Sequence, residues 1–298
     1  MLHGPDLDNA SVGKAEMTPS KAHRNFSTST GRSLSDPPPI ALAIGGSDPT
    51  GGAGIQADLK TFSQLGVHGL SVVTAVTVQN TRGVLSTNPV HADIVEAQLA
   101  ALGEDVTIDA IKIGMLTSAK VVRIVSDFVR AQQVPTVLDP VLASSNGVPF
   151  LDGAAKEALV RELCPWASIV TPNLFEASVW TNMEIASEQD MQNAALRLIE
   201  AGAKNVLVKG GHGDGEESRD LFMGERETEW LSAPRSTKRV HGTGCVLASA
   251  IAASLAQGDP MLTAVRRAKS FTTRMIERAV ALGAGQEIFQ FMSQETVV

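Results

Sequence analysis

Short apolar runs of strand length alternate with segments of helical periodicity from residue 40 onward. The first run spans residues 40–44, and the next segment repeats apolar residues at the spacing of one helix face, at Ile55, Leu59, Phe62 and Leu65. The same pattern predicts further strands at 72–78, 110–113, 136–138, 169–170 and 206–208. Helices are predicted between them at 118–132, 153–164 and 188–201.

Strands that are separated by helices favour a parallel sheet covered on both faces. We therefore predict an α/β fold in which residues 40–298 form one domain. A more polar stretch at 220–230 breaks the alternation and is typical of a hairpin that turns at Gly224 and Glu225. Two helices are expected after it, one starting near Cys245 and one opening at Asp259-Pro260.

Residues 1–39 differ from the rest of the chain. They are rich in Ser, Thr, Asn, Asp and Pro, carry four acidic and four basic side chains, and end in three consecutive prolines. Such a segment buries too little apolar surface to offset the entropy of ordering. We expect a disordered amino-terminal tail.

Composition excludes several classes of function for the 298-residue chain. A net charge of −7 without a Lys/Arg cluster argues against nucleic acid as a partner, and no apolar run approaches the ~18 residues of a membrane span. The two cysteines, Cys164 and Cys245, lie far apart and outside any zinc-type spacing. We expect a cytoplasmic protein in which Cys164 is a buried helical thiol.

The run His241-Gly242-Thr243-Gly244-Cys245 leads directly into an apolar helix. Glycines at a helix start let backbone N–H groups converge, and the helix dipole adds positive potential, so this turn suits an anion. A thiol in the first helical turn is placed where the thiolate is favoured. We therefore expect a lowered pKa for Cys245 and a role in accepting a proton.

Other polar clusters follow the predicted strands, where ligands collect in parallel sheets. Five glycines lie between the first strand and the first helix without matching a dinucleotide or P-loop pattern. Asp58 in that helix faces either ligand or solvent, and solvent is favoured on local grounds. Gln79 offers a donor and an acceptor to a heteroaromatic ring or belongs to a plain turn. Met115 lines an aromatic pocket or the core.

A second set of strand-end residues suits phosphate and metal. Asp139 is a carboxylate at a strand terminus, and Asn173 and Glu176 share a helical face at a spacing that suits water-mediated Mg²⁺, although Asn173 could instead cap the helix. Lys209 supplies a cation at another strand end, whereas His212 is expected to be a loop histidine without a chemical role.

Taken together, these motifs resemble the ribokinase superfamily, and within it the hydroxymethylpyrimidine/phosphomethylpyrimidine kinases. The resemblance runs from about Ile40 to Arg278. The motifs that carry it are Gly-Gly-Ser-Asp-Pro-Thr-Gly-Gly-Ala-Gly-Ile-Gln-Ala-Asp-Leu-Lys from Gly45, Val-Gln-Asn-Thr-Arg-Gly from Val78, Lys-Ile-Gly-Met-Leu from Lys112, and His-Gly-Thr-Gly-Cys from His241. The implied fold is a three-layer sandwich with a mostly parallel central sheet.

The resemblance implies ATP and Mg²⁺ as cofactors, a small pyrimidine as substrate, and two successive phosphoryl transfers in thiamine biosynthesis. It implies substrate contacts at Gly46, Asp58, Gln79, Met115 and Val141. It implies ATP contacts at Asp139, Lys209, Gly242, Thr243 and Gly244, with Asn173 and Glu176 ordering Mg²⁺ through water and Cys245 as the catalytic residue. We also expect a homodimer.

Two features depart from the superfamily pattern. Most members carry an aspartate base at the position of Cys245, a departure shared with the pyrimidine-kinase branch. The ending after Gly283 lacks the expected His-containing tail, so contacts there are not carried over. Two alternatives remain open at this stage: a pyridoxal or pyridoxine kinase of the same fold, and a non-catalytic nucleotide or vitamin-precursor binding protein.

Overall fold

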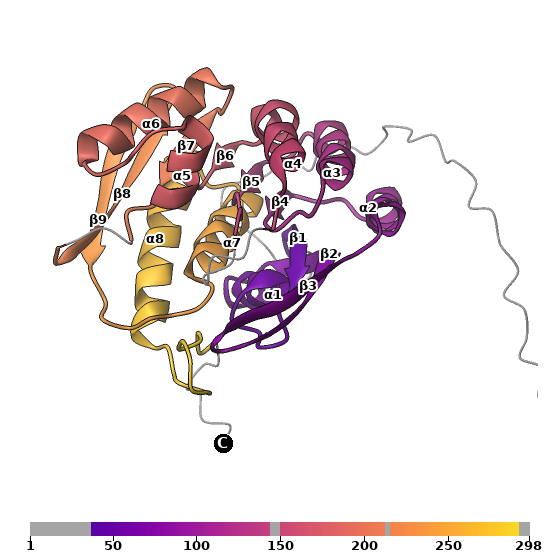
Figure 1. Cartoon of the computed structure of the whole chain (residues 1–298). Coiled ribbons are helices and arrows are strands. Elements are labelled where there is room, and N and C mark those ends of the chain that lie inside the picture. The colour runs from indigo at the N-terminus through magenta and orange to yellow at the C-terminus, as the bar shows by residue number, and fades with distance from the viewer. Residues whose placement is uncertain (1–36, 144–149, 212–214, 292–298) are drawn as a thin grey trace, which may run out of the picture.

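The computed structural model describes residues 37–143, 150–211 and 215–291. Its centre is a nine-stranded sheet with the order β3-β2-β1-β4-β5-β6-β7-β8-β9 (Figure 1). The six strands from β2 to β7 in this order pair in parallel, while β3, β8 and β9 are antiparallel additions at the two edges. The prediction of a mostly parallel α/β sheet is confirmed.

The parallel strands other than β2 are largely buried because both faces of the sheet are covered. They are β1 (Ile40–Ser47), β2 (His68–Asn80), β4 (Ala110–Ile113), β5 (Thr136–Leu138), β6 (Ile169–Val170) and β7 (Asn205–Val208). The edge strands are β3 (Gly83–Pro89), β8 (Glu217–Gly224) and β9 (Thr228–Pro234). In β1, Leu42 and Ile44 pack into one core while Ala41 and Ala43 pack into the other.

Helices form a layer on each side of the sheet (Figure 1). One layer contains α2 (Ala92–Asp105), α3 (Ala119–Gln132), α4 (Gly153–Ala158), α5 (Leu174–Thr181) and α6 (Glu188–Glu200). The other contains α1 (Gly54–Gln64), α7 (Thr243–Ala256) and α8 (Met261–Glu277). Every residue of α7 from Val246 to Ala256 is buried, and α7 contacts β1, β4 and β5, so it is the central helix of its layer.

The structure extends the predicted elements at three places. The segment 153–164 is helical, but a π-helical turn (Leu159–Leu163) and a 3₁₀ turn (Cys164–Trp166) follow α4, and Cys164 is buried as expected. Sequence reasoning missed α2, whose buried face consists of Val95 and Leu99. It also missed β3, because Gly, Ser, Thr, Asn and Pro give this largely exposed strand the composition of a loop.

Two glycine-rich turns meet at the carboxyl ends of the strands. One links β1 to α1 and the other precedes α7, where Gly242 has a φ of +83°. A Cβ on Gly242 would lie 2.0 Å from the carbonyl oxygen of Gly52. The first turn and the start of α7 are therefore in backbone contact, and only glycine fits at position 242.

This contact predicts an unequal cost for two alanine substitutions. Gly66 also has a positive φ, of +73°, but a Cβ there meets nothing within 4 Å. Gly66→Ala should therefore lower the free energy of unfolding by the left-handed conformational cost alone, about 1–2 kcal/mol. Gly242→Ala adds a clash with backbone and should cost at least about 2 kcal/mol more. Urea unfolding of both variants measures the difference, and equal costs would show that the two turns separate freely.

Candidate active site

The residues expected to meet phosphate converge at the start of α7. Asp139 follows β5 and Lys209 follows β7, and the Lys209 Nζ lies 2.7 Å from the Asp139 Oδ1. A Cβ on Gly244 would lie 3.1 Å from the same Nζ. The structure thus brings Asp139, Lys209 and the glycine turn together, as the sequence predicts.

Lys209 is a buried cation at this point. Its side chain is 13% exposed, and the hydroxyl of Thr171 donates to the Asp139 Oδ1 at 3.1 Å. Burial disfavours the ammonium, but attraction from Asp139, Glu176 and Cys245 outweighs it and raises the pKa of Lys209. Lys209 therefore keeps its charge and can attract a phosphate oxygen.

Asn173 and Glu176 form a capping box at the start of α5. The Glu176 N–H donates to the Asn173 Oδ1, and the Asn173 N–H donates to the Glu176 Oε2, both at 2.8 Å. The alternative that Asn173 caps the helix is confirmed. A backbone bridge between Asn173 and Lys209 brings the start of α5 beside the end of β7. Burial raises the pKa of Glu176 to about 7, with Asp139 adding to the rise and Lys209 opposing it.

On the other side of the glycine turns, Gly46 and Met115 are in close contact. A Cβ on Gly46 would lie 2.8 Å from the Met115 sulfur, so any larger residue would displace this side chain. Gln79 is half-buried near the end of β2, and its side-chain amide makes no hydrogen bond within the described residues. Val141 is half-buried just after β5. Of these four residues the structure brings only Gly46 and Met115 into close contact, and the substrate roles of all four stay predictions.

Asp58 is not at the surface, so the solvent-facing interpretation was wrong. Its side chain is 0% exposed, and its oxygens bind the Lys112 Nζ at 2.9 Å and accept from the Ser249 hydroxyl at 2.7 Å. The cause is tertiary: α7 covers this face of α1 and leaves no solvent there. With both oxygens occupied and no exposed surface, Asp58 requires a rearrangement to touch a ligand directly.

Lys112 is a site residue that sequence reasoning missed. It is 1% exposed on β4, and although burial disfavours its charge, attraction from Asp58, Cys245 and Asp139 raises its pKa. The Lys-Ile-Gly-Met-Leu motif predicted a role in the site only for Met115. A lysine inside an otherwise apolar strand, Ala-Ile-Lys-Ile, was the available signal, because a buried lysine needs a carboxylate partner.

Cys245 lies at the start of α7 as expected, but its pKa is not lowered. Burial raises the pKa of the thiol to about 11, and Asp58 and Asp139 add to the rise, whereas Lys112 and the Gly54 N–H oppose it. The prediction of a lowered pKa considered only the dipole of the helix that starts at this residue. Nearby carboxylates and low solvent access outweigh it, so the resting group is a thiol.

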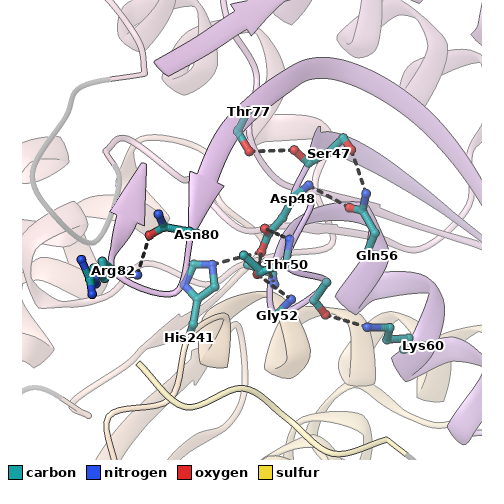
Figure 2. A network of polar contacts seen from close by, with 12 residues as sticks. Ser47, Asp48, Thr50, Gly52, Gln56, Lys60, Thr77, Asn80, Arg82 and His241 are labelled. Carbon is teal, nitrogen blue, oxygen red and sulfur yellow. Dashed lines mark hydrogen bonds and ion pairs between the residues drawn. The ribbon is translucent and has the colours of Figure 1, made fainter. Parts of the chain in front are cut away.

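Asp48 and His241 form a second missed contact. The His241 Nε2 lies 3.1 Å from the Asp48 Oδ2 across 193 positions of sequence (Figure 2). Asp48 is 2% exposed. Both residues stand inside the quoted motifs, but nothing in the sequence indicates that they touch. His212, expected to have no chemical role, lies outside the described residues.

The raised pKa of Glu176 predicts a pH-dependent contribution to stability. A carboxyl whose folded pKa exceeds its unfolded value stabilises below the unfolded pKa, and that stabilisation is lost as pH rises through the folded pKa. We therefore expect the free energy of unfolding of the parent, relative to Glu176→Gln, to fall between pH about 4.5 and about 7. Urea midpoints of both proteins from pH 5 to 8 test this. A difference that does not change with pH would contradict it.

Comparison with known proteins places this site in a family. A family model described as phosphomethylpyrimidine kinase matches residues 48–290. The hydroxymethylpyrimidine/phosphomethylpyrimidine kinase of Rhizobium meliloti (strain 1021) is 47% identical over 249 residues, which are 83% of this chain and 94% of that relative.

Solved structures agree. The phosphomethylpyrimidine kinase of Clostridium difficile 630 has 39% sequence identity and a TM-score of 0.70, covering 80% of this chain and 99% of that one. A pyridoxal kinase of Bacillus subtilis in complex with ADP has 32% identity and a TM-score of 0.78, covering 85% and 97%. The ribokinase-like fold is thereby confirmed, and the chain belongs to the phosphomethylpyrimidine kinase family.

Proposed function

We propose that this kinase transfers the γ-phosphoryl group of ATP to the hydroxymethyl oxygen of 4-amino-5-hydroxymethyl-2-methylpyrimidine. It then phosphorylates the monophosphate to the diphosphate for thiamine biosynthesis. The observation that carries the proposal is the backbone contact of Gly52 with Gly242, which places the predicted pyrimidine turn beside the predicted phosphate turn. Family membership supplies the reaction class. Residues 40–298 act as one catalytic domain in this proposal.

The pyrimidine binds on the β1–β2 side of the turns. The lack of a Cβ at Gly46 lets the Met115 thioether pack against the end of β1, where it can line one side of the ring. The side-chain amide of Gln79, which has no hydrogen-bond partner among the described residues, can pair with a ring nitrogen and an exocyclic amino group. Val141 closes the apolar side of the ring. Asp58 contributes by holding Lys112 in place through their ion pair, rather than by contacting the pyrimidine directly.

ATP binds along the β5–β7 side. Lys209 and the N–H groups of Gly242, Thr243 and Gly244 face the phosphates, because a helix start and a buried ammonium both attract negative charge. Asp139 orients Lys209 through its 2.7 Å ion pair. The Bacillus subtilis pyridoxal kinase was solved as an ADP complex, which supports nucleotide use by this chain.

Asn173 and Glu176 hold Mg²⁺ through water in this proposal. Glu176 is 6% exposed, and among the described residues its carboxyl accepts a hydrogen bond only at Oε2. A buried carboxyl whose pKa is raised to about 7 gains from a nearby cation, so the donor chemistry fits the ion. Among the described residues no three His, Cys, Asp or Glu side chains gather as direct ligands, which leaves water to complete the shell. Bound Mg²⁺ neutralises charge on the phosphates.

Catalysis rests mainly on positioning and charge stabilisation. The substrate oxygen forms a bond to the γ-phosphorus as the bond from that phosphorus to the bridging oxygen of ADP breaks. N–H donors of the α7 turn and Lys209 stabilise charge on the equatorial oxygens, where one such donor contributes about 3 kcal/mol. The hydroxyl proton passes to Cys245 in its thiolate form, a minor form at neutral pH because the thiol pKa is about 11.

The rivals predict different substrates. A pyridoxal kinase shares the fold, and one such structure has 32% identity to this chain. Gln79 and Met115 favour the aminopyrimidine. A non-catalytic binding protein has no need for Asn173, Glu176 and Lys209 arranged around a phosphate turn, so this arrangement supports an enzyme.

Oligomeric state and location are further parts of the proposal. Val76 and Val78 on β2 are each 49% exposed and Leu85 on β3 is 73% exposed, an apolar edge that supports a homodimer. Both cysteines are free thiols, as a reducing cytoplasm favours. No described helix has the length and hydropathy to cross a membrane.

A coupled assay of ADP release tests the function directly. With Mg·ATP, the pyrimidine should turn over with a higher kcat/KM than pyridoxal, and mass spectrometry should detect the monophosphate before the diphosphate. Preference for pyridoxal would favour the rival kinase. Binding of the pyrimidine without ADP release would favour the non-catalytic protein.

Gln79→Leu should weaken pyrimidine recognition specifically. Loss of a buried hydrogen-bond partner costs about 1–3 kcal/mol, so the KM for the pyrimidine should rise roughly 10- to 100-fold while the KM for ATP stays within about twofold. The matched control is Gln189→Leu on the exposed face of α6. An unchanged pyrimidine KM in Gln79→Leu would remove this residue from the site.

Cys245→Ser should lower kcat by about 10²-fold at saturating substrates, because the proton acceptor is lost. Since the thiol pKa is about 11, the thiolate fraction of the parent grows with pH, and log kcat should climb from pH 7 to 9. The climb should vanish in Cys245→Ser and persist in Cys164→Ala, which removes the buried thiol. Turnover of Cys245→Ser within about threefold of the parent, with the same slope, would show that the proton leaves by another route.

A further inference from the structure

Asp48 is the centre of the turn between β1 and α1, and its carboxylate accepts four hydrogen bonds from the described residues. Its Oδ1 accepts from the Thr50 N–H at 2.8 Å, and its Oδ2 accepts from the Thr50 hydroxyl at 2.9 Å and the Ala53 N–H at 2.8 Å. The His241 Nε2 approaches the same Oδ2 at 3.1 Å. Figure 2 shows Thr50 and His241 beside Asp48, on two separate segments of the chain.

The carboxylate is stable in this place although it is buried. Burial raises the pKa of Asp48, but the hydrogen bonds from His241, Thr50 and Ala53 outweigh burial and bring it down to about 2. Asp48 is therefore an acceptor at every ordinary pH. His241 must carry a proton on Nε2 to donate to it, since the carboxylate has none to give.

This network reaches the reacting thiol in two ways. The Ala53 N–H is bound to Asp48, and a Cβ on Gly242 would lie 3.0 Å from the Ala53 Cα, so this residue lies against the turn that starts α7. The N–H of the next residue, Gly54, is close enough to the Cys245 thiol to oppose the rise of its pKa. His241 stands four positions before Cys245 in the turn that starts α7, so its contact with Asp48 joins the two glycine-rich turns beside this thiol.

The main chain of His241 is anchored independently of its side chain. Its N–H donates to the Glu287 carbonyl at 2.8 Å, and a Cβ on Gly52 would lie 2.8 Å from the Ile288 side chain. The carboxy-terminal segment at Glu287 and Ile288 therefore contacts both turns. Loss of the imidazole removes the bond to Asp48 while this backbone support remains.

We propose that the Asp48–His241 contact is a positioning pair that holds the Gly54 N–H against the Cys245 thiol. Only the expected effect of this pair on turnover rests on the proposed function. The pair acts through Gly54 and touches no reacting atom. Without it the first turn is free to move away from α7. The Gly54 donor then leaves the sulfur, and the hydroxymethyl group bound beside that turn loses its alignment.

Kinetics of four variants test the pair as a unit. His241→Ala and Asp48→Asn should each lower kcat by about 10- to 100-fold, the range expected of a displaced reacting group, while the KM for ATP stays within about threefold. The double variant should be no slower than the slower single variant. His241→Gln, which keeps an N–H donor, should recover part of kcat. If the losses of kcat multiply in the double variant, or if His241→Gln recovers no kcat, the two residues do not act as a positioning pair.

A second measurement separates positioning from general destabilisation and does not depend on which substrate is used. Alkylation of Cys245 by iodoacetamide, followed by peptide mapping, reports the thiolate as pH is varied. The charged groups that interact with this thiol are Lys112, Lys209, Asp58 and Asp139, and none of them is altered. Because the Gly54 N–H stabilises the thiolate, the midpoint of the alkylation profile should move to higher pH in His241→Ala.

The matched control is His91→Ala, which removes an exposed histidine 3.5 Å from Asp93 and should leave kcat and the alkylation midpoint unchanged. An unchanged midpoint in His241→Ala, with rates reduced only in proportion to the unfolded fraction, would show a purely structural contact. If the parent does not phosphorylate the pyrimidine, the proposed function fails, while the shift of the alkylation midpoint still decides the positioning role.

Discussion

The close approach of Gly242 to the Gly52 carbonyl is the constraint on which the site depends. A parallel sheet delivers its strand ends to one edge, but it does not fix the loops that follow them. Here two turns from opposite ends of the chain are pressed together at a distance that only glycine allows. The buried helix α7 starts at this contact, so its N–H groups and Cys245 take their positions from the same turn.

The charge balance around α7 explains the state of the thiol. Lys112 and Lys209 are the cations, and Asp58, Asp139 and Glu176 are the carboxyl groups that surround them. At Cys245, burial and the carboxylates of Asp58 and Asp139 outweigh the opposing effect of Lys112, so the pKa of the thiol is raised to about 11. The same excess of carboxyl groups favours a divalent cation, because added positive charge relieves the buried Glu176.

Sequence patterns predicted most of the sheet, because the strands of a doubly covered sheet are short apolar runs that need no partner to be recognised. They missed β3 and α2, whose exposed faces carry little periodicity. The glycine motifs lie at the end of β1 and at the start of α7, and the roles of their residues in the site stay predictions. The chemistry was less predictable: Asp58 was expected at the surface, and the Cys245 pKa was expected to be low.

Both errors share one cause. They were argued from local helix geometry, whereas tertiary packing decided the outcome. Helix α7 covers Asp58, and burial together with the carboxylates of Asp58 and Asp139 raises the pKa of Cys245. The Asp48–His241 contact spans 193 positions, so it too depends on the tertiary structure.

The central claim is that the two joined turns form one preorganised site, which holds the hydroxymethyl group of the substrate beside the Cys245 thiol. A crystal structure with the pyrimidine, Mg²⁺ and a non-hydrolysable ATP analogue tests it most directly. The account predicts the hydroxymethyl oxygen within hydrogen-bond reach of the Cys245 sulfur, the γ-phosphate at the Gly242–Gly244 N–H groups, and an unchanged contact of Gly52 with Gly242. A hydroxymethyl group directed away from Cys245, or turns that separate when the ligands bind, would contradict it.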